Sequence, residues 1–269
     1  MQIFVEAEES ITDGLVPGSD LENIQDGWTV AVEKFLITLG NVRIAHGGSS
    51  GGNDALDDPK LQVIDMKTLA ASGLLLATFK DIDAIRWDKV GYDQGYASAT
   101  AVRPDGTAQA DFDMMVAGGF SLYVSGSMTK PGQPTVSYAW GLRSGVTWSD
   151  CGPPMGDKGF AVSAGGTTQV KATIHGDHWF FNNFPEADEE TKRLAQWIAD
   201  VDAMTGGDHQ VTAADLALVP ASAVFPAPRY SLQNALGAPI ASALDYVTTQ
   251  ARTIGHLQGE GECGSLAPL

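Results

Sequence analysis

A series of short strand-like segments, separated by turns rich in glycine and proline, constrains the fold more than any other feature of this chain. Residues 2–7 alternate between apolar and polar as a first strand should, and residues 121–128 and 135–140 flank a hairpin turn. Many short strands at regular spacing predict a mainly β fold, an antiparallel β-sandwich. Further strands are expected at residues 28–44 (two strands or one bulged strand), 61–66, 74–79, 85–96 and 167–181.

The hydrophobic period changes to that of a helix after Pro185. One helix is predicted around residues 194–201, and Thr212 with Asp215 predicts a capping box at the start of a second. A longer helical face begins near Ser231, with Pro239 as a kink or a late start. We therefore expect a β-sandwich domain at residues 1–184 and a helical C-terminal region at 185–269, packed together as one globular unit.

The charge of the chain excludes some partners. Thirty-three acidic residues against 16 lysines and arginines give a formal net charge of −17, which disfavours binding to nucleic acid or to anionic lipid. The carboxylates would attract cations, although acidity can also serve solubility alone. No apolar run is long enough to predict a transmembrane segment, and a protein partner is neither indicated nor excluded.

The two cysteines, Cys151 and Cys263, lie in turn-like sequences far apart in the chain. A disulfide between them would tie the C-terminal tail to the β region and would indicate a periplasmic or extracellular protein. The N-terminus shows no signal sequence, so an exported protein would have its leader absent from this sequence. The alternative is two unrelated cytosolic thiols.

Residues 173–181 hold two of the five histidines, an acid and three aromatic residues. Imidazole suits copper, zinc, iron or nickel, and His175, Asp177 and His178 could supply ligands from one segment. A straight strand would point the two imidazoles to opposite faces, so the site requires a local bend at Gly176. His46 and His256, the latter near Glu260, could complete it; otherwise the histidine pair has only structural roles.

The segment from Asp200 to Asp215 resembles a degraded calcium-binding loop between two helices. Calcium prefers oxygen ligands at alternating positions with a closing carboxylate, and the segment offers four carboxylates. Met204 stands at one ligand position, however, and the loop is too long. An ordinary interhelical turn with capping residues is the alternative. The candidate calcium ligands are Asp200, Asp202, Asp208 and Asp215.

No catalytic residue can be assigned. Patterns such as Gly-x-Ser-x-Gly, His-Glu-x-x-His and Ser-x-x-Lys do not occur in settings that would make them catalytic, and Asp111 and Asp113 stand in loop-like sequence. Four tryptophans could form a sugar-stacking platform on a sandwich, although strand tryptophans usually belong to the core. They are Trp87, Trp140, Trp148 and Trp179.

Residues 26–44, from Asp-Gly-Trp to Asn-Val-Arg-Ile, resemble the early strands of the methanobactin-associated family of bacterial periplasmic copper-binding proteins. The resemblance covers about the first third of the chain. It implies a β-rich fold that binds copper through two histidines and an oxidatively modified tryptophan. On this resemblance, His175 and His178 beside Trp179 would be the nearest equivalent set.

Taken together, these patterns predict an extracytoplasmic protein that binds copper or zinc without catalysis, through the cluster around His175 and His178. The alternative is a cell-surface interaction or carbohydrate-binding module with structural calcium.

Overall fold

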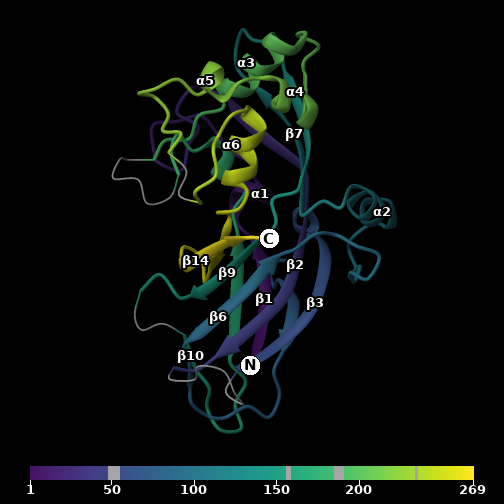
Figure 1. The fold of residues 1–269 in the computed structure, drawn as a ribbon, viewed down its shortest axis with the longest axis vertical. Helices are drawn as coiled ribbons and strands as arrows, with labels where there is room; N and C mark the ends of the chain where they lie inside the picture. Colours follow the sequence, from purple (N-terminus) through teal and green to yellow (C-terminus); the bar gives the residue numbers. More distant parts are fainter. Residues whose placement is uncertain (48–54, 156–158, 185–190, 234–235) are drawn as a thin grey trace.

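The computed structural model describes residues 1–47, 55–155, 159–184, 191–233 and 236–269. The protein is mainly β, with α3, α4 and α5 gathered at one end of the molecule and α2 projecting from one side (Figure 1). The strands are β1 (Gln2–Ala7), β2 (Thr29–Ala45), β3 (Ala55–Asp65), β4 (Leu74–Thr78), β5 (Arg86–Trp87), β6 (Lys89–Gln94), β7 (Leu122–Thr129), β8 (Val136–Leu142), β9 (Val146–Cys151), β10 (Phe160–Ala161), β11 (Gln169–Ile174), β12 (Gln210–Thr212), β13 (Gly255–Leu257) and β14 (Cys263–Pro268). The helices are α1 (Glu9–Thr12), α2 (Gln109–Gly118), α3 (Gln196–Thr205), α4 (Ala213–Leu218), α5 (Ala221–Val224) and α6 (Ala243–Gln250), with 3-10 turns η1 (Met66–Thr68) and η2 (His178–Phe180).

Two sheets form the sandwich. The larger sheet runs β12-β8-β7-β2-β6-β9-β14, with β3 paired to β2, and the smaller sheet runs β13-β11-β1-β4. Most pairings are antiparallel, as predicted, but β1 pairs with β11, and β8 with β12, in parallel. The pairing of β1 with β11 places the first strand of the chain directly beside the segment that precedes His175.

The segment predicted at residues 28–44 is one bulged strand, β2, of 17 residues. It pairs with β7 along its first part and with β6 along its second, and its pairing registers shift near Val32 and Gly40. A Cβ atom at position 40 would lie 1.9 Å from the carbonyl oxygen of Lys60, and the backbone φ of Gly40 is +150°. Glycine is therefore required where the strand bends.

Aromatic side chains fill the core between the sheets. Trp87 is 2% exposed, and Trp140, Trp148 and Trp179 are fully buried. The sugar-stacking platform suggested by these tryptophans is therefore wrong, because no ring can present its face to a ligand in solvent. Trp179 instead packs against Phe35 and Trp140.

The C-terminal helical region differs from its prediction in extent. Thr212 and Asp215 form the predicted capping box of α4. The helical face expected from Ser231 begins only at Ala243, after a second capping box. Ser242 Oγ accepts from the Asp245 N–H, and the Asp245 carboxylate accepts from the Ser242 N–H. The region also supplies β12, β13 and β14 to the two sheets. The proposed domain boundary between residues 184 and 185 adjoins residues outside the described ranges and stays a prediction.

One helix lies where loop was expected. Asp111 and Asp113 belong to α2, and Lys34 pairs with Asp111 at 2.5 Å. Gly119, in the left-handed conformation, ends this helix as a C-terminal glycine commonly does. The segment has little amphipathic periodicity, which is why the pattern failed to reveal it.

Cys151 and Cys263 form a disulfide that joins the directly opposite ends of β9 and β14. The predicted covalent link between the β region and the C-terminal tail is thus present. Within the ranges that the structure describes, no helix combines the length and the apolar character needed to cross a membrane.

Candidate metal centre

The alternation of side chains along the smaller sheet brings the candidate ligands to one face. Thr173 of β11 pairs with His256 of β13 and with Glu6 of β1. Directly paired residues share a face, as do residues two positions apart, so His175 and Glu8 lie on the same face as these three. The backbone pairing continues beyond the strands, because Glu8 N–H donates to Ile174 O and His175 N–H donates to Ile254 O. The opposite face carries apolar residues of the core.

The chain turns away from the strand direction at Gly176. β11 ends at Ile174, Asp177 has φ −126° and ψ −8°, and His178 begins the 3-10 turn η2. Gly176 N–H donates to Ser10 Oγ at 2.9 Å, and a Cβ at this position would lie 2.6 Å from Ile11 Cγ1. Glycine is needed here for the close approach of α1. The turn removes the strand geometry that would point His175 and His178 to opposite faces.

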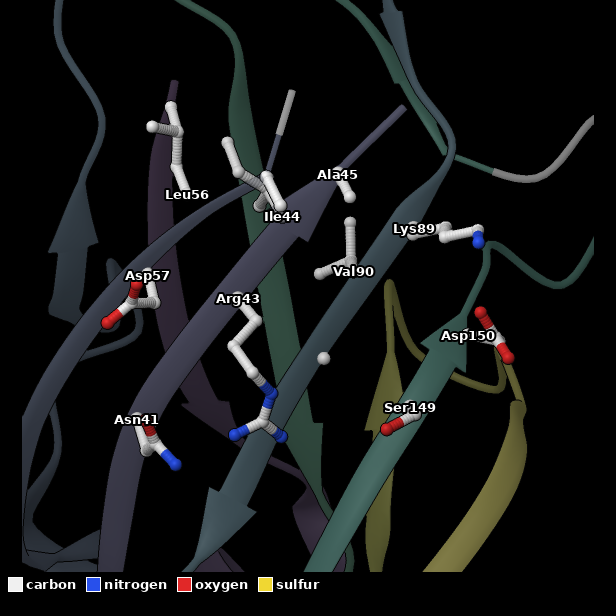
Figure 2. Close-up of a pocket in the computed structure, with 12 residues that line it drawn as sticks. Asn41, Arg43, Ile44, Ala45, Leu56, Asp57, Lys89, Val90, Ser149 and Asp150 are labelled. Atoms are coloured by element: carbon white, nitrogen blue, oxygen red, sulfur yellow. The ribbon is translucent and has the colours of Figure 1, made fainter. Parts of the chain in front are cut away.

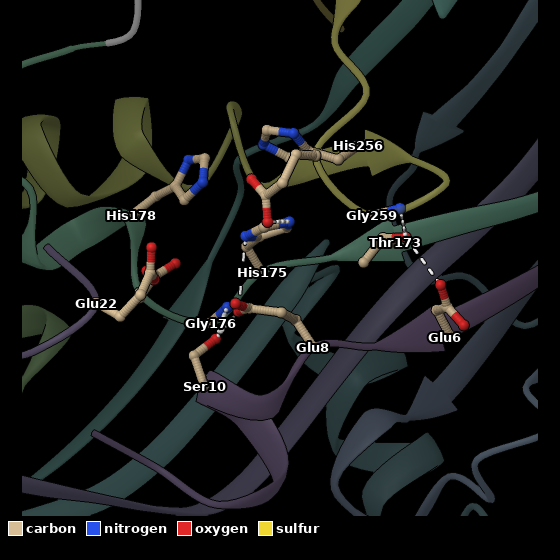
Figure 3. A network of polar contacts seen from close by, with 12 residues as sticks. Glu6, Glu8, Ser10, Glu22, Thr173, His175, Gly176, His178, His256 and Gly259 are labelled. Carbon is tan, nitrogen blue, oxygen red and sulfur yellow. Dashed lines mark hydrogen bonds and ion pairs between the residues drawn. The ribbon is translucent and has the colours of Figure 1, made fainter. Parts of the chain in front are cut away.

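Three imidazoles consequently surround one space (Figure 3). The ring centroid of His175 lies 4.2 Å from that of His256 and 5.4 Å from that of His178, and the other pair is 5.3 Å apart. One ring nitrogen of each lies within 4.8 Å of the others. Nitrogens bound to one tetrahedral ion at about 2.0–2.1 Å would be roughly 3.3 Å apart, so modest side-chain rotation would close the group on an ion.

A hydrogen bond assigns the tautomer of His178. Its Nδ1 lies 2.7 Å from Thr253 Oγ1, and that hydroxyl donates its single proton to the Gln250 carbonyl oxygen. The hydroxyl can therefore only accept from His178, so Nδ1 carries the proton and Nε2 holds the free lone pair. A metal-binding histidine is commonly oriented through its other nitrogen in this way. Phe181 stacks on the ring at 4.5 Å between centroids and restricts it further.

The other two imidazoles hold nitrogens with no hydrogen-bond partner among the described residues: His175 Nε2 and both ring nitrogens of His256. His175 and His178 are 3% exposed and His256 is 5% exposed. Burying polar atoms without partners is costly, and a bound cation would satisfy them.

Burial also favours the uncharged form that a metal needs. Desolvation lowers the pKa of His178 well below its usual value, helped by His175 and the Arg193 charge. Desolvation, with the neighbouring His178 and His175, lowers the pKa of His256 to about 2. Neutral imidazoles offer lone pairs, so these rings are prepared for an ion near neutral pH.

Asp177, a predicted ligand, lies outside this group. Its Oδ2 accepts from Arg193 Nε at 2.5 Å in a buried ion pair, and Arg193 also pairs with Glu22 at 2.6 Å. A carboxylate already committed to a guanidinium is a poor metal ligand. Asp177 instead fixes the position of Arg193, whose guanidinium lies over the ring of Phe181.

His46 is likewise placed elsewhere. It follows β2 and meets Trp87 edge-on, with ring centroids 5.5 Å apart. Neither group of possible metal ligands found in the described chain includes it.

The four candidate calcium ligands have separate roles, and no three of them come together in the part of the chain described. Asp200 and Asp202 lie within α3 instead of a loop. Asp200 accepts from Gln196 Nε2, and Asp202 accepts from the His209 backbone. Asp208 accepts from the Gln210 backbone, and Asp215 caps α4.

Carboxylates rim the buried imidazoles. Glu8 Oε2 lies 3.6 Å from His175 Nδ1, Glu260 Oε1 lies 4.0 Å from His175 Nε2, and Glu262 Oε1 lies 3.8 Å from His256 Nδ1. Glu260 and Glu262 are about three-quarters exposed, whereas Glu8 is mostly covered. Desolvation, then the nearby Asp177, raises the pKa of Glu8.

A separate groove of about 510 Å³ crosses β2, β3, β6 and β9 (Figure 2). Arg43 lies in it and pairs with Asp93 at 2.7 Å. The described lining contains no histidine or cysteine, so the groove is unrelated to the imidazole group.

Sequence reasoning missed Glu8 and Thr253. The alternation of β1 places Glu6 and Glu8 on its polar face, which is a usable signal, but their nearness to His175 depends on the parallel pairing with β11. Thr253 follows α6 without any motif of its own.

Comparison of the chain with protein families, with curated proteins and with solved structures found no match.

Proposed function

We propose that the protein is an extracytoplasmic metal-binding protein that holds one copper or zinc ion at His175, His178 and His256. The observation that carries this function is the group of three buried imidazoles, with ligand atoms within 4.8 Å of one another and ring nitrogens left without partners. Imidazole is the preferred protein nitrogen ligand of both metals. The resemblance of residues 26–44 to periplasmic copper-binding proteins agrees with copper.

Holding an ion is favoured over catalysis. The three rings are at most 5% exposed, which leaves little room for a substrate beside a bound ion. A site closed to substrate is typical of proteins that retain a metal.

The Cys151–Cys263 disulfide supports a location outside the cytoplasm. Disulfides persist in oxidising compartments and are rare where thioredoxin and glutathione keep thiols reduced. Thiol titration of the native protein before and after reduction tests this: free thiols in the native protein would remove the support.

The metal-binding function is tested on untagged protein, loaded with Cu²⁺ or Zn²⁺ and dialysed before metal analysis. About one ion per chain should remain, and none should remain in His178→Ala/His256→Ala. The variant His46→Ala/His209→Ala is the matched control, because it removes two histidines outside the group. Wild-type protein that retains neither metal would refute the function.

A further inference from the structure

A second group of possible ligands adjoins the imidazoles. Glu8, His175 and Glu260 also bring one ligand atom each within 4.8 Å of one another. We call this the outer position and the group of three histidines the inner position. His175 belongs to both, and Figure 3 shows it between Glu8 and His256.

The two carboxylates lack a cationic partner. Glu6, on the same face of β1, pairs with Lys171 at 2.6 Å. For Glu8 and Glu260, by contrast, the described chain provides no lysine or arginine within ion-pair distance, and both carboxylates face His175. Desolvation and the charge of Asp177 raise the pKa of Glu8, and the charge of Glu260 adds to that rise. A cation between them would relieve this repulsion.

Hydrogen bonds also fix the orientation of a ligand in the outer position. Gly176 N–H donates to Ser10 Oγ at 2.9 Å, and that hydroxyl donates to Glu8 Oε2, so the carboxylate is anchored to the turn that carries His175. His175 Nε2, in a side chain 4% exposed, has no hydrogen-bond partner among the described residues and lies 4.0 Å from Glu260 Oε1. The buried nitrogen is thus directed at an exposed carboxylate.

We propose that the outer position is a second cation site, through which a divalent ion passes to the inner position. It presupposes the metal-binding function above. Glu260 meets the ion from solvent, since its side chain is 74% exposed, and Glu8 and His175 take it below the surface. Because His175 is shared, the ion can exchange two carboxylates for two imidazoles one ligand at a time. Copper and zinc prefer imidazole to carboxylate, so transfer runs inward.

Rapid mixing of metal-free protein with Zn²⁺ tests the route. Glu8→Gln/Glu260→Gln should still retain about one Zn²⁺ at equilibrium but should take it up roughly tenfold more slowly than wild type. Glu9→Gln/Glu33→Gln is the control: it removes two exposed carboxylates outside both groups and should load within about twofold of the wild-type rate. Equal slowing in both variants would show general electrostatic attraction and overturn the outer position.

A second measurement isolates the outer position at equilibrium. In His178→Ala/His256→Ala its three ligands remain, so calorimetry should detect weak Zn²⁺ binding that dialysis reverses, and adding Glu8→Gln/Glu260→Gln should abolish it. Absence of the weak binding would refute the outer position. If wild type binds no Zn²⁺ or Cu²⁺ tightly, the function itself fails; if it binds tightly and the Glu8/Glu260 variant loads at the normal rate, only the route fails.

Discussion

Thr253 accepts a hydrogen bond from His178 Nδ1 at 2.7 Å while donating its own proton to the Gln250 carbonyl. The turn after α6 thus fixes which nitrogen of His178 is free for a metal. The residue that orients His178 lies only three positions before His256, another of the three clustered histidines. One short segment therefore controls two sides of the centre.

Replacing Thr253 with valine, which keeps the shape but removes the hydroxyl, should weaken metal binding by about 10- to 100-fold. The loss arises because the His178 ring is no longer held in one tautomer and orientation. Competition titration against a chelator of known affinity measures it. Thr253→Ser, which keeps the hydroxyl, should bind nearly as tightly as wild type. Equal affinity in the valine and serine variants would contradict the role of the hydroxyl.

The metal-free protein should lose stability on acidification. The pKa values of His178 and His256 are lowered on folding, so below about pH 6.5 the unfolded chain binds protons that the folded protein excludes. Stability therefore rises with pH in this range, by about 1.4 kcal/mol from His256 between pH 5.5 and 7.5 and by a further amount from His178. Urea unfolding at the two pH values measures the difference.

His256→Gln supplies the comparison for this acid sensitivity. The variant should show a smaller loss between pH 7.5 and 5.5, whereas His209→Gln, at a half-exposed histidine, should behave as wild type. An unchanged loss in His256→Gln would mean that other groups cause the pH dependence.

Removal of the disulfide by Cys151→Ser/Cys263→Ser should lower the free energy of unfolding by roughly 2–5 kcal/mol, since the link closes a long stretch of chain. The same change should hasten loss of bound metal, because Cys263 packs against the Gly255 carbonyl beside His256. Thermal unfolding and chelator-induced release measure the two effects. Lower stability with unchanged release would show that the disulfide serves the fold but not the centre.

Gly176→Ala should destabilise the protein by about 1–3 kcal/mol, because its methyl group would lie 2.6 Å from Ile11 Cγ1 and 3.3 Å from the Ile11 backbone nitrogen. Displacement of α1 would also move Glu8 away from His175. Chemical denaturation checks the first effect, and the rate of Zn²⁺ uptake checks the second. Gly166→Ala, where the nearest atom is 3.4 Å away, is the control and should be close to neutral.

Local patterns predicted much of the fold. The β-branched and aromatic run of β2 and the Thr212 capping box are readable because each depends on neighbours in sequence. The weakly periodic α2 and the late start of α6 could not be predicted from local patterns, since capping and tertiary packing determine them. The parallel pairing of β1 with β11 is a long-range choice for which no local signal exists.

The residues of the centre were also predictable in part from local sequence. His175 and His178 stand out by composition, and the need for a bend at Gly176 follows from strand geometry. His256 could be named as a partner because a disulfide would bring the tail to the sheet. Asp177 was predicted as a ligand because it stands between the two histidines in sequence. Its buried partner, Arg193, lies 16 residues away and gave no local signal.

The pairing of β11 with β13 determines the stage of folding at which the three imidazoles come together. His175 and His178 belong to one segment and His256 to another, joined only when α6 and its following turn have folded against the sheet. A partly folded chain therefore offers an ion two imidazoles without the third. Under the proposed function, the metal that the protein acquires should then depend on the compartment in which folding is completed and on the ions present there.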